Sequence, residues 1–457
     1  MSRMVWFLGP VARPLPACRL WLLIGFALGC SSRVSQEPLV PPDHDGDGYD
    51  ALLAGGDDCD DEDAAVHPGA ADPVETTGPW AIEPVTDQAS DWPAVAVGPG
   101  GVVHAAYGAW PPCHPEPPEK KCFADEMDKS LTVRHARRVD GAWSTAEVDG
   151  MSDAGLYTSL AVDGEGFAHI AYYRIWDDQY SEALRYATDR GGTWAVQTPD
   201  PAAPIAYHTA IHVRDDGAVT IAYRDVVHAD PARDDDPFCV NDEPCDAALA
   251  LAVADAKGNW TIEHVEVGGS LGWDPAMAAD AVGTIHLAYP SLDPSDDLRY
   301  ARGRPGAWSI EAVEQEGRVG QATAIAIDAA GAVHIAYHRY NPKGYGREVR
   351  YATNAGGRWR IESVEERDNL QEATRIAVDT LGRVHVTYVD FAAGSSLRHA
   401  TRSAQGWEVE VVAEGVWGGF DMKSVFGALH VVYATDGGLE YARFPLATDQ
   451  DCDGEDG

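Results

Sequence analysis

Alternating aspartates near the N-terminus are the residues of this chain best suited to bind a metal ion. Asp43, Asp45 and Asp47 alternate in the stretch DHDGDGYD, and Tyr49 follows them. Such a loop can fold several oxygens, including the Tyr49 carbonyl, around Ca²⁺, which prefers about six to eight oxygen ligands. A complete EF-hand loop needs a bidentate acid at its twelfth position, where this chain has Ala54. The stretch therefore predicts half of a calcium site.

A second acidic stretch, DQDCDGEDG, ends the chain and resembles the missing half. Together with GGDDCDDED after the first loop, it resembles the Asp- and Cys-rich metal-binding repeat of bacterial surface proteins and, more loosely, thrombospondin type 3 repeats. In that family the two halves are contiguous, whereas here the body of the chain separates them. The alternative is an acidic tail that binds no ion. The resemblance implies structural Ca²⁺ held by Asp43, Asp45, Asp47, Tyr49, Asp58, Asp60, Asp449, Asp451 and Asp453.

The first 30 residues are typical of an export signal. Three arginines precede the apolar run LWLLIGFALG, which is too short to span a bilayer as a helix. The run ends at Cys30 in ALGC, which resembles the bacterial lipobox. That resemblance implies a lipid on Cys30 and, with Ser31 behind it, an extracytoplasmic protein anchored in the outer membrane. A plain secretory signal is the alternative.

Export would permit disulfides in the mature chain. Sequence leaves their connectivity open, but two pairs lie close together in long loops, and the remaining pair would join the two acidic stretches. The suggested pairs are Cys113 with Cys122, Cys239 with Cys245, and Cys59 with Cys452.

The body of the chain repeats with a period near 50 residues, which is typical of a propeller or a solenoid. Each unit contains an apolar run, an Asp/Gly turn, an H-x-A-Y strand, an L-R-Y-A strand and a strand that begins at Trp. The second-strand Tyr occurs seven times: Tyr107, Tyr172, Tyr223, Tyr289, Tyr337, Tyr388 and Tyr433. The second-strand His occurs six times, with Thr220 at the remaining position: His104, His169, His286, His334, His385 and His430.

The last unit lacks a fourth strand, and GPWAIEPVTD near the N-terminus has the pattern of one. We therefore predict an all-β, seven-bladed β-propeller of four-stranded blades, in which an N-terminal strand starting near Trp80 completes the last blade. The body resembles sialidase-like and lectin-like propellers with H-x-A-Y repeats. The expected parts are a signal peptide (1–30), a tether (31–42), an Asp-rich segment (43–77), the propeller (78–447) and a C-terminal half-motif (448–457).

The repeated His and Tyr residues are better explained as structure than as a site. Six equivalent histidines suit hydrogen bonds between strands or blades, since buried polar groups need partners. The alternative is a multivalent lectin with similar pockets between successive blades.

A binding site is expected where the repeat is least regular. Two long loops leave blades one and three on the face where the first strands begin, and loops on a rigid scaffold often carry binding residues. An acidic and aromatic rim suits a sugar or a cationic group; a solvated rim of turn-forming residues is the alternative. The candidates on this face are Asp91, Trp92, Tyr157, His208, Trp273, Asp274, Glu372 and Asp421.

An enzyme is the second hypothesis. Arg174, Arg224 and Arg339 follow second-strand tyrosines, and sialidase-like propellers hold a carboxylate with three arginines. However, Arg224 follows its Tyr by one residue and the other two by two residues, so strand alternation sends them to opposite faces. The Asp box of sialidases, a G-x-S-x-G elbow and H-E-x-x-H are absent.

The net charge of −39 argues against nucleic acid as a partner. We therefore expect a monomeric, calcium-stabilised surface lipoprotein, bound to the membrane only by its lipid. Its propeller would bind carbohydrate or a surface protein without catalysis. The alternative is a sialidase-like hydrolase or a polysaccharide lyase that acts on acidic glycans.

Overall fold

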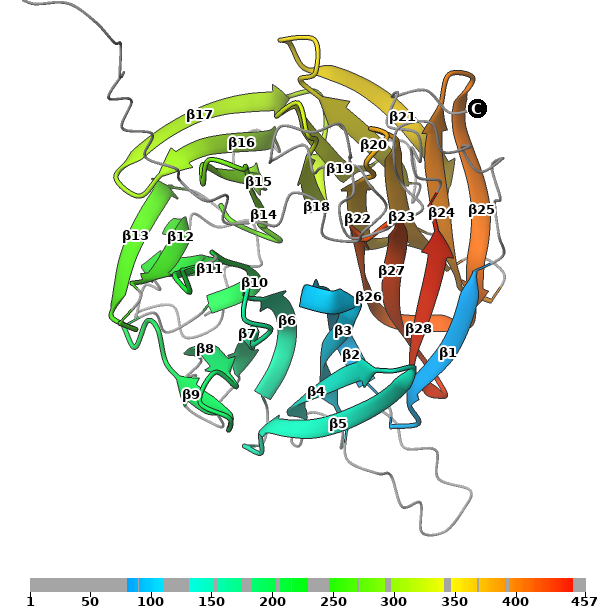
Figure 1. The fold of residues 1–457 in the computed structure, drawn as a ribbon. Helices are drawn as coiled ribbons and strands as arrows, with labels where there is room; N and C mark the ends of the chain where they lie inside the picture. Colours follow the sequence, from blue (N-terminus) through cyan, green and yellow to red (C-terminus); the bar gives the residue numbers. More distant parts are fainter. Residues whose placement is uncertain are drawn as a thin grey trace, which may run out of the picture.

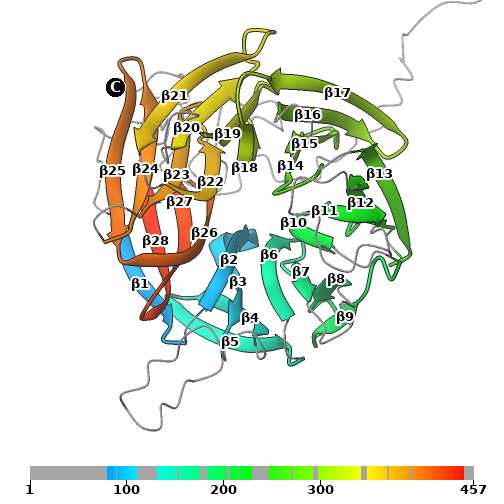
Figure 2. The same cartoon turned by 180° about the vertical axis from the view of Figure 1, so that it is seen from behind.

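The fold is a closed ring of seven antiparallel sheets, seen along its axis in Figures 1 and 2. The structure is a computed structural model, and it confirms the predicted seven-bladed β-propeller. The described residues are 80–88, 90–110, 131–151, 154–174, 183–202, 206–214, 216–228, 246–255, 257–268, 271–291, 297–340, 347–367, 370–391 and 394–446.

Every blade has four strands, with its first strand nearest the axis and its fourth at the rim. The short 3₁₀ turn η2 (Pro99–Gly101) lies between β2 and β3. The strands are β2 (Ser90–Gly98), β3 (Val102–Ala109), β4 (Thr132–Val139) and β5 (Ala142–Asp149) in blade 1; β6 (Ala154–Val162), β7 (Ala168–Arg174), β8 (Ala183–Thr188) and β9 (Ala195–Gln197) in blade 2; β10 (Ala206–Val213), β11 (Val219–His228), β12 (Asp246–Ala254) and β13 (Trp260–Val267) in blade 3; β14 (Ala276–Ala279), β15 (Ile285–Ser291), β16 (Asp297–Arg304) and β17 (Ala307–Glu314) in blade 4; β18 (Val319–Ile327), β19 (Val333–Tyr340), β20 (Arg347–Thr353) and β21 (Arg360–Arg367) in blade 5; β22 (Leu370–Val378), β23 (Val384–Asp390), β24 (Ser396–Ser403) and β25 (Gly406–Glu414) in blade 6; and β26 (Val416–Val425), β27 (Ala428–Thr435), β28 (Gly438–Pro445) and β1 (Ala81–Thr86) in blade 7.

The N-terminal strand closes the ring, as the sequence predicts. β1 is antiparallel to β28 at the rim of blade 7, and Ala81 pairs with Arg443. Figures 1 and 2 show β1, in blue, beside the red β28 and between β25 and β5. Because the start of β1 lies against the end of β28, the chain enters and leaves blade 7 at the same end.

The core lies between blades. Small residues near the axis let the inner strands converge: Ala94 and Ala106 of blade 1 pack with Leu160 and Ile170 of blade 2. Large rings fill the rim, where blades diverge. Trp260 of blade 3, for example, packs on Tyr186 of blade 2 with ring centroids 5.1 Å apart.

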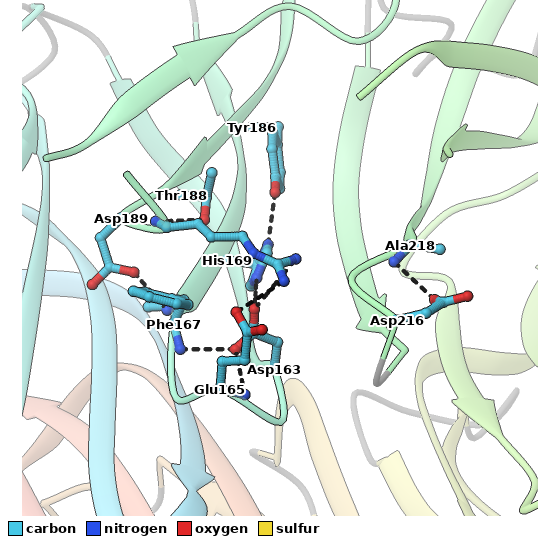
Figure 3. A network of polar contacts seen from close by, with 11 residues as sticks. Asp163, Glu165, Phe167, His169, Tyr186, Thr188, Asp189, Asp216 and Ala218 are labelled. Carbon is cyan, nitrogen blue, oxygen red and sulfur yellow. Dashed lines mark hydrogen bonds and ion pairs between the residues drawn. The ribbon is translucent and has the colours of Figure 1, made fainter. Parts of the chain in front are cut away.

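The second-strand histidines belong to buried relays, as expected for structural residues. In blade 2, His169 Nε2 lies 3.1 Å from Asp163 Oδ2, and His169 Nδ1 lies 2.6 Å from the Tyr186 hydroxyl. Figure 3 shows these three side chains together with the turn that Asp163 also caps. A neutral imidazole protonated on Nε2 donates to the aspartate and accepts from the tyrosine, so every group is satisfied.

Blade 3 lacks this relay, and all three of its positions differ there. Arg214, Thr220 and Leu251 occupy the positions that Asp163, His169 and Tyr186 hold in blade 2. Blades 4 and 5 have the complete relay, as Asp280–His286–Tyr300 and Asp328–His334–Tyr351.

The repeated Tyr and Trp residues join neighbouring blades. Tyr172 donates to Asp149 at 2.7 Å, and Tyr223, Tyr289, Tyr337 and Tyr388 likewise donate to an acid in the preceding blade. At the rim, Trp359 Nε1 donates to Glu311 of blade 4 at 3.0 Å. Bonds of the same kind at the rim join Trp80 to Glu410 and Trp143 to Glu83.

Candidate functional site

Five non-glycine residues with left-handed backbone mark the mouth of the ring, where first strands begin. Trp92, Tyr157, His208, Asp274 and Ala322 have φ between 40° and 51°. The strand register shifts at all of them except Asp274, which precedes β14. Such bulges re-aim side chains, and this conformation is unfavourable for residues with a Cβ. The sequence hypothesis named four of these five residues.

Threonine hydroxyls from the next blade hold this unfavourable backbone. In four of the five cases a Thr near the start of the following blade's first strand donates to the carbonyl of the left-handed residue, and two of these bonds measure 2.7 Å and 2.5 Å. The neighbouring blade thus helps to hold the backbone conformation of these four residues. The pairs are Thr158 with Trp92, Thr209 with Tyr157, Thr323 with Asp274, and Thr374 with Ala322.

Four rings from consecutive blades contact one another along this mouth. The centroid distances are 5.6 Å from Trp92 to Tyr157, 4.0 Å from Tyr157 to His208, and 5.7 Å from His208 to Trp273. All four side chains are partly exposed. We call these four residues the aromatic arc. The fully buried Arg224 lies 4.2 Å over the Trp273 ring and supports it from blade 3.

Acidic groups accompany the aromatic arc. His208 Nδ1 forms an ion pair with Asp274 Oδ1. Burial opposes ionisation of Asp274, but His208, Arg375 and His338 together hold its pKa below the ordinary value. Burial raises the pKa of Tyr157 to about 12, with contributions from the charges of Asp274 and Asp91. The mouth therefore presents a protonated phenol between two carboxyl groups.

Asp91 and Asp421 fasten blade 7 to blade 1. Asp91 Oδ1 accepts from the Gly419 amide at 3.0 Å, and Asp421 Oδ2 accepts from the Val95 amide at 3.0 Å. Asp421 Oδ1 also lies 2.7 Å from Arg375 Nε. These two candidates thus hold the ring together as well as facing its mouth.

The other sequence candidates are placed less centrally. Arg174 is buried at the end of β7, and Arg339 Nη1 lies 3.8 Å from Glu348. The Glu372 side chain lies outside the described part, although its backbone is in β22. The three arginines of the enzyme hypothesis therefore have separate surroundings: Arg224 on Trp273, Arg339 beside Glu348, and Arg174 in blade 2.

The predicted metal, lipid and disulfide residues lie outside the described ranges. They are Asp43, Asp45, Asp47, Tyr49, Asp58, Asp60, Asp449, Asp451 and Asp453, with Cys30, Cys59, Cys113, Cys122, Cys239, Cys245 and Cys452. Within those ranges there is no cluster of three or more potential metal ligands, and no helix is long and apolar enough to cross a bilayer.

A second hollow lies at the rim between blades 4 and 5. Tyr300, Arg302, Glu311 and Trp359 line it. Its tryptophan and acid are already joined by the interblade hydrogen bond described above, and Tyr300 belongs to the relay of blade 4. The hollow is therefore built from repeated scaffold residues, whereas the aromatic arc is confined to blades 1 to 4.

The missed residues differ from one blade to the next. Trp417 is 60 % exposed at the start of β26, where blades 2 and 5 have Gly155 and Gly320. Arg318, Tyr340 and Arg347 cluster at the mouth of blade 5. Comparison of the units position by position would have shown Trp417 as a departure from the glycines of blades 2 and 5.

Comparison with known proteins shows a shared fold. No family model and no curated protein matches the chain. Among solved structures, an ulvan lyase described as a new polysaccharide lyase family has a TM-score of 0.54 at 12 % identity, over 79 % of this chain and 95 % of that one. The chain shares its propeller fold. A second structure of such a lyase, bound to a GlcA–Rha3S glycan, has a TM-score of 0.53 at 12 % identity with the same coverage. The six-bladed Aleuria aurantia lectin has a TM-score of 0.42 at 14 % identity, over 73 % of this chain and 99 % of that one.

Proposed function

We propose that the protein is a carbohydrate-binding module whose site is the mouth of the ring. The observation that carries this proposal is the aromatic arc, four contacting and partly exposed rings from four blades. Sugar rings present apolar C–H faces that pack on aromatic rings, while their hydroxyls bond to nearby polar groups. Asp274 and the Tyr157 hydroxyl supply such groups beside the rings.

The rigidity of the mouth supports this function. Threonine bonds and interblade carboxylates fix the backbone from which the arc projects. A preorganised site loses little conformational entropy on binding, so this cost offsets little of the favourable free energy of the stacking contacts. A solvated rim of turn residues would need neither the left-handed bulges nor the ring contacts.

Trp92→Ala should weaken glycan binding at least tenfold, which corresponds to about 1.4 kcal/mol or more. The substitution removes one end of the aromatic arc and its contact with Tyr157. A glycan array would first identify a bound glycan, and titration calorimetry would then compare the variants. Phe426→Ala is the matched control, because Phe426 is an exposed aromatic in the β26–β27 turn on the opposite face. An array with no bound glycan, or equal affinities, would contradict the proposal.

A second candidate function is a polysaccharide lyase or glycoside hydrolase. Tyr157 and His208 are adjacent side chains able to carry a proton, and Asp274 orients the imidazole. The shared fold with a polysaccharide lyase supports including this activity in the test. Incubation with acidic polysaccharides, monitored by the ultraviolet absorbance of unsaturated products and by reducing ends, separates binding from catalysis.

We also propose that Ca²⁺ joins the two acidic stretches and that the mature protein is a lipid-anchored surface protein. The pairing of Ala81 with Arg443 supports the calcium proposal, because the segments before Trp80 and after Leu446 leave the same end of blade 7. A calcium ion there would fasten the closing strand. The GlcA–Rha3S ligand of the similar lyase structure supports a glycan as the external partner.

Removal of Ca²⁺ should lower the melting temperature. A ligand present at 100 times its dissociation constant stabilises the folded state by about 2.7 kcal/mol. Calorimetry in calcium and in chelator measures this shift, and an Asp45→Asn/Asp451→Asn variant should lose it. An unchanged melting temperature would refute the calcium proposal, and peptide mapping without reduction would show whether Cys59 is bonded to Cys452.

A further inference from the structure

Two arginines enclose a tyrosine at the mouth of blade 5. The guanidinium carbons of Arg318 and Arg347 lie 4.8 Å and 4.7 Å from the centroid of the Tyr340 ring. Contact with an aromatic face restrains the orientation of a guanidinium group. We call Arg318, Tyr340 and Arg347 the arginine clamp. No equivalent cluster occurs in the other blades as the structure describes them.

The arginine clamp lies on the same face as the aromatic arc. Arg318 precedes β18, Tyr340 ends β19 and Arg347 begins β20, and all three positions are at the end of the blade where first strands start. The Tyr340 amide donates to the Arg318 carbonyl at 2.9 Å. Arg347 Nη1 donates to the Leu370 carbonyl at 3.0 Å, so the clamp reaches blade 6.

A buried histidine, His338, lies in the same strand as Tyr340 of the clamp. It is fully buried in β19, two residues before Tyr340. Burial and the charge of Arg347 together lower its pKa to about 3, against the opposing charge of Asp274. The arc ends at Trp273, just before β14 of blade 4, and Thr323 of blade 5 donates to the neighbouring Asp274 carbonyl, so the arc and the clamp lie on adjacent blades.

Arg318 is an exposed cation at the mouth of blade 5. The chain has 34 basic and 73 acidic residues, and neighbouring arginines are paired: Arg339 with Glu348, Arg350 with Glu314, and Arg375 with Asp421. Arg318 is exposed and, among the described residues, has no carboxylate within ion-pair distance. The charge of Arg318 is therefore available to an anionic ligand from solution.

We propose that the arginine clamp binds the carboxylate or sulfate of an anionic polysaccharide whose sugar rings pack on the aromatic arc. The inference rests on the proposed function and names its substrate class. Guanidinium groups bind both anions through paired N–H donors, and these charge-assisted bonds are stronger than neutral ones.

The test is an array of neutral, carboxylated and sulfated glycans, probed with the full mature chain. Binding should concentrate on the carboxylated or sulfated glycans and weaken as salt is added, since screening reduces interactions between exposed charges. Comparison of each bound glycan with its carboxyl-reduced and desulfated forms identifies whether the protein recognises the carboxylate or the sulfate. Arg318→Ala should weaken binding about tenfold or more, which is the loss of roughly one charge-assisted contact.

Two further variants make the result specific. Arg318→Lys keeps the charge without the planar fork and should give intermediate affinity. Arg304→Ala removes an exposed arginine at the far end of β16, on the opposite face, and should bind like the wild type. Binding restricted to neutral glycans, or an Arg318→Ala affinity equal to that of Arg304→Ala, would overturn the inference but leave the proposed function intact. An array with no bound glycan would overturn both.

Discussion

Acidification from about pH 7 to about pH 5 should destabilise the propeller by several kcal/mol, a large part of the stability of a typical protein. The cause is the set of buried imidazoles in the blades. Burial, with nearby arginines, lowers the pKa of His104 and His430 to about 4. Burial also lowers the pKa of His169, His286 and His334, although their aspartates oppose it.

The sign follows from proton uptake. In the unfolded chain a histidine binds a proton below about pH 6.5, whereas in the fold these imidazoles stay neutral to a lower pH. Their stabilisation is complete above the unfolded pKa and is lost as the pH falls toward the folded one. A histidine with a folded pKa near 4 contributes roughly 2 kcal/mol of this loss by pH 5, at about 1.4 kcal/mol per pH unit.

Chemical denaturation at about pH 7, about pH 6 and about pH 5 measures this slope. The matched variant is His430→Thr/Tyr441→Leu, which gives blade 7 the pair that blade 3 has in Thr220 and Leu251. This variant should be less stable at neutral pH but should lose less stability on acidification. A pH slope equal to that of the wild type would show that His430 is not among the groups responsible.

The fold could be predicted because its signals repeat. The Trp and Tyr spacing counts the blades, and the match of Trp80 to the other fourth-strand tryptophans is enough to locate the closing strand. Thr220 and Leu251 show the limit of this logic. In the sequence they look like two separate departures from the repeat. In the fold they occupy the His and Tyr positions of the same relay.

The candidate site could be predicted only in part. The first-strand positions of Trp92, Tyr157 and His208 follow from the repeat, but their left-handed backbone does not, because residues with a Cβ rarely adopt it. Contacts between blades impose that conformation. The sequence did not reveal the arginine clamp, because Arg318, Tyr340 and Arg347 are separated along the chain. The two arginines meet only at the Tyr340 ring, where strands of blade 5 end at the mouth.

Trp80→Ala should destabilise the protein by roughly 2–4 kcal/mol, near the lower part of the range for large aromatic deletions because Trp80 is only partly buried. Trp80 packs against Phe444 at 5.0 Å and His399 at 5.4 Å, and its Nε1 donates to Glu410 of blade 6 at 3.0 Å. On the other side of β1, Glu83 binds Arg138 and Trp143 of blade 1. Trp80 is therefore one of the side chains that hold the strand that closes the ring.

Loss of that fastening should act on ring closure more than on a single blade. When β1 detaches, β28 becomes an open edge and blade 7 keeps three strands, so unfolding can begin there. Equilibrium denaturation measures the stability, and limited proteolysis should show faster cleavage within Ala81–Thr86 in the variant. Trp417→Ala is the control, since it removes the same side chain type from a position that is 60 % exposed. If both variants unfold alike and β1 stays protected, closure must depend on the β1–β28 hydrogen bonds alone.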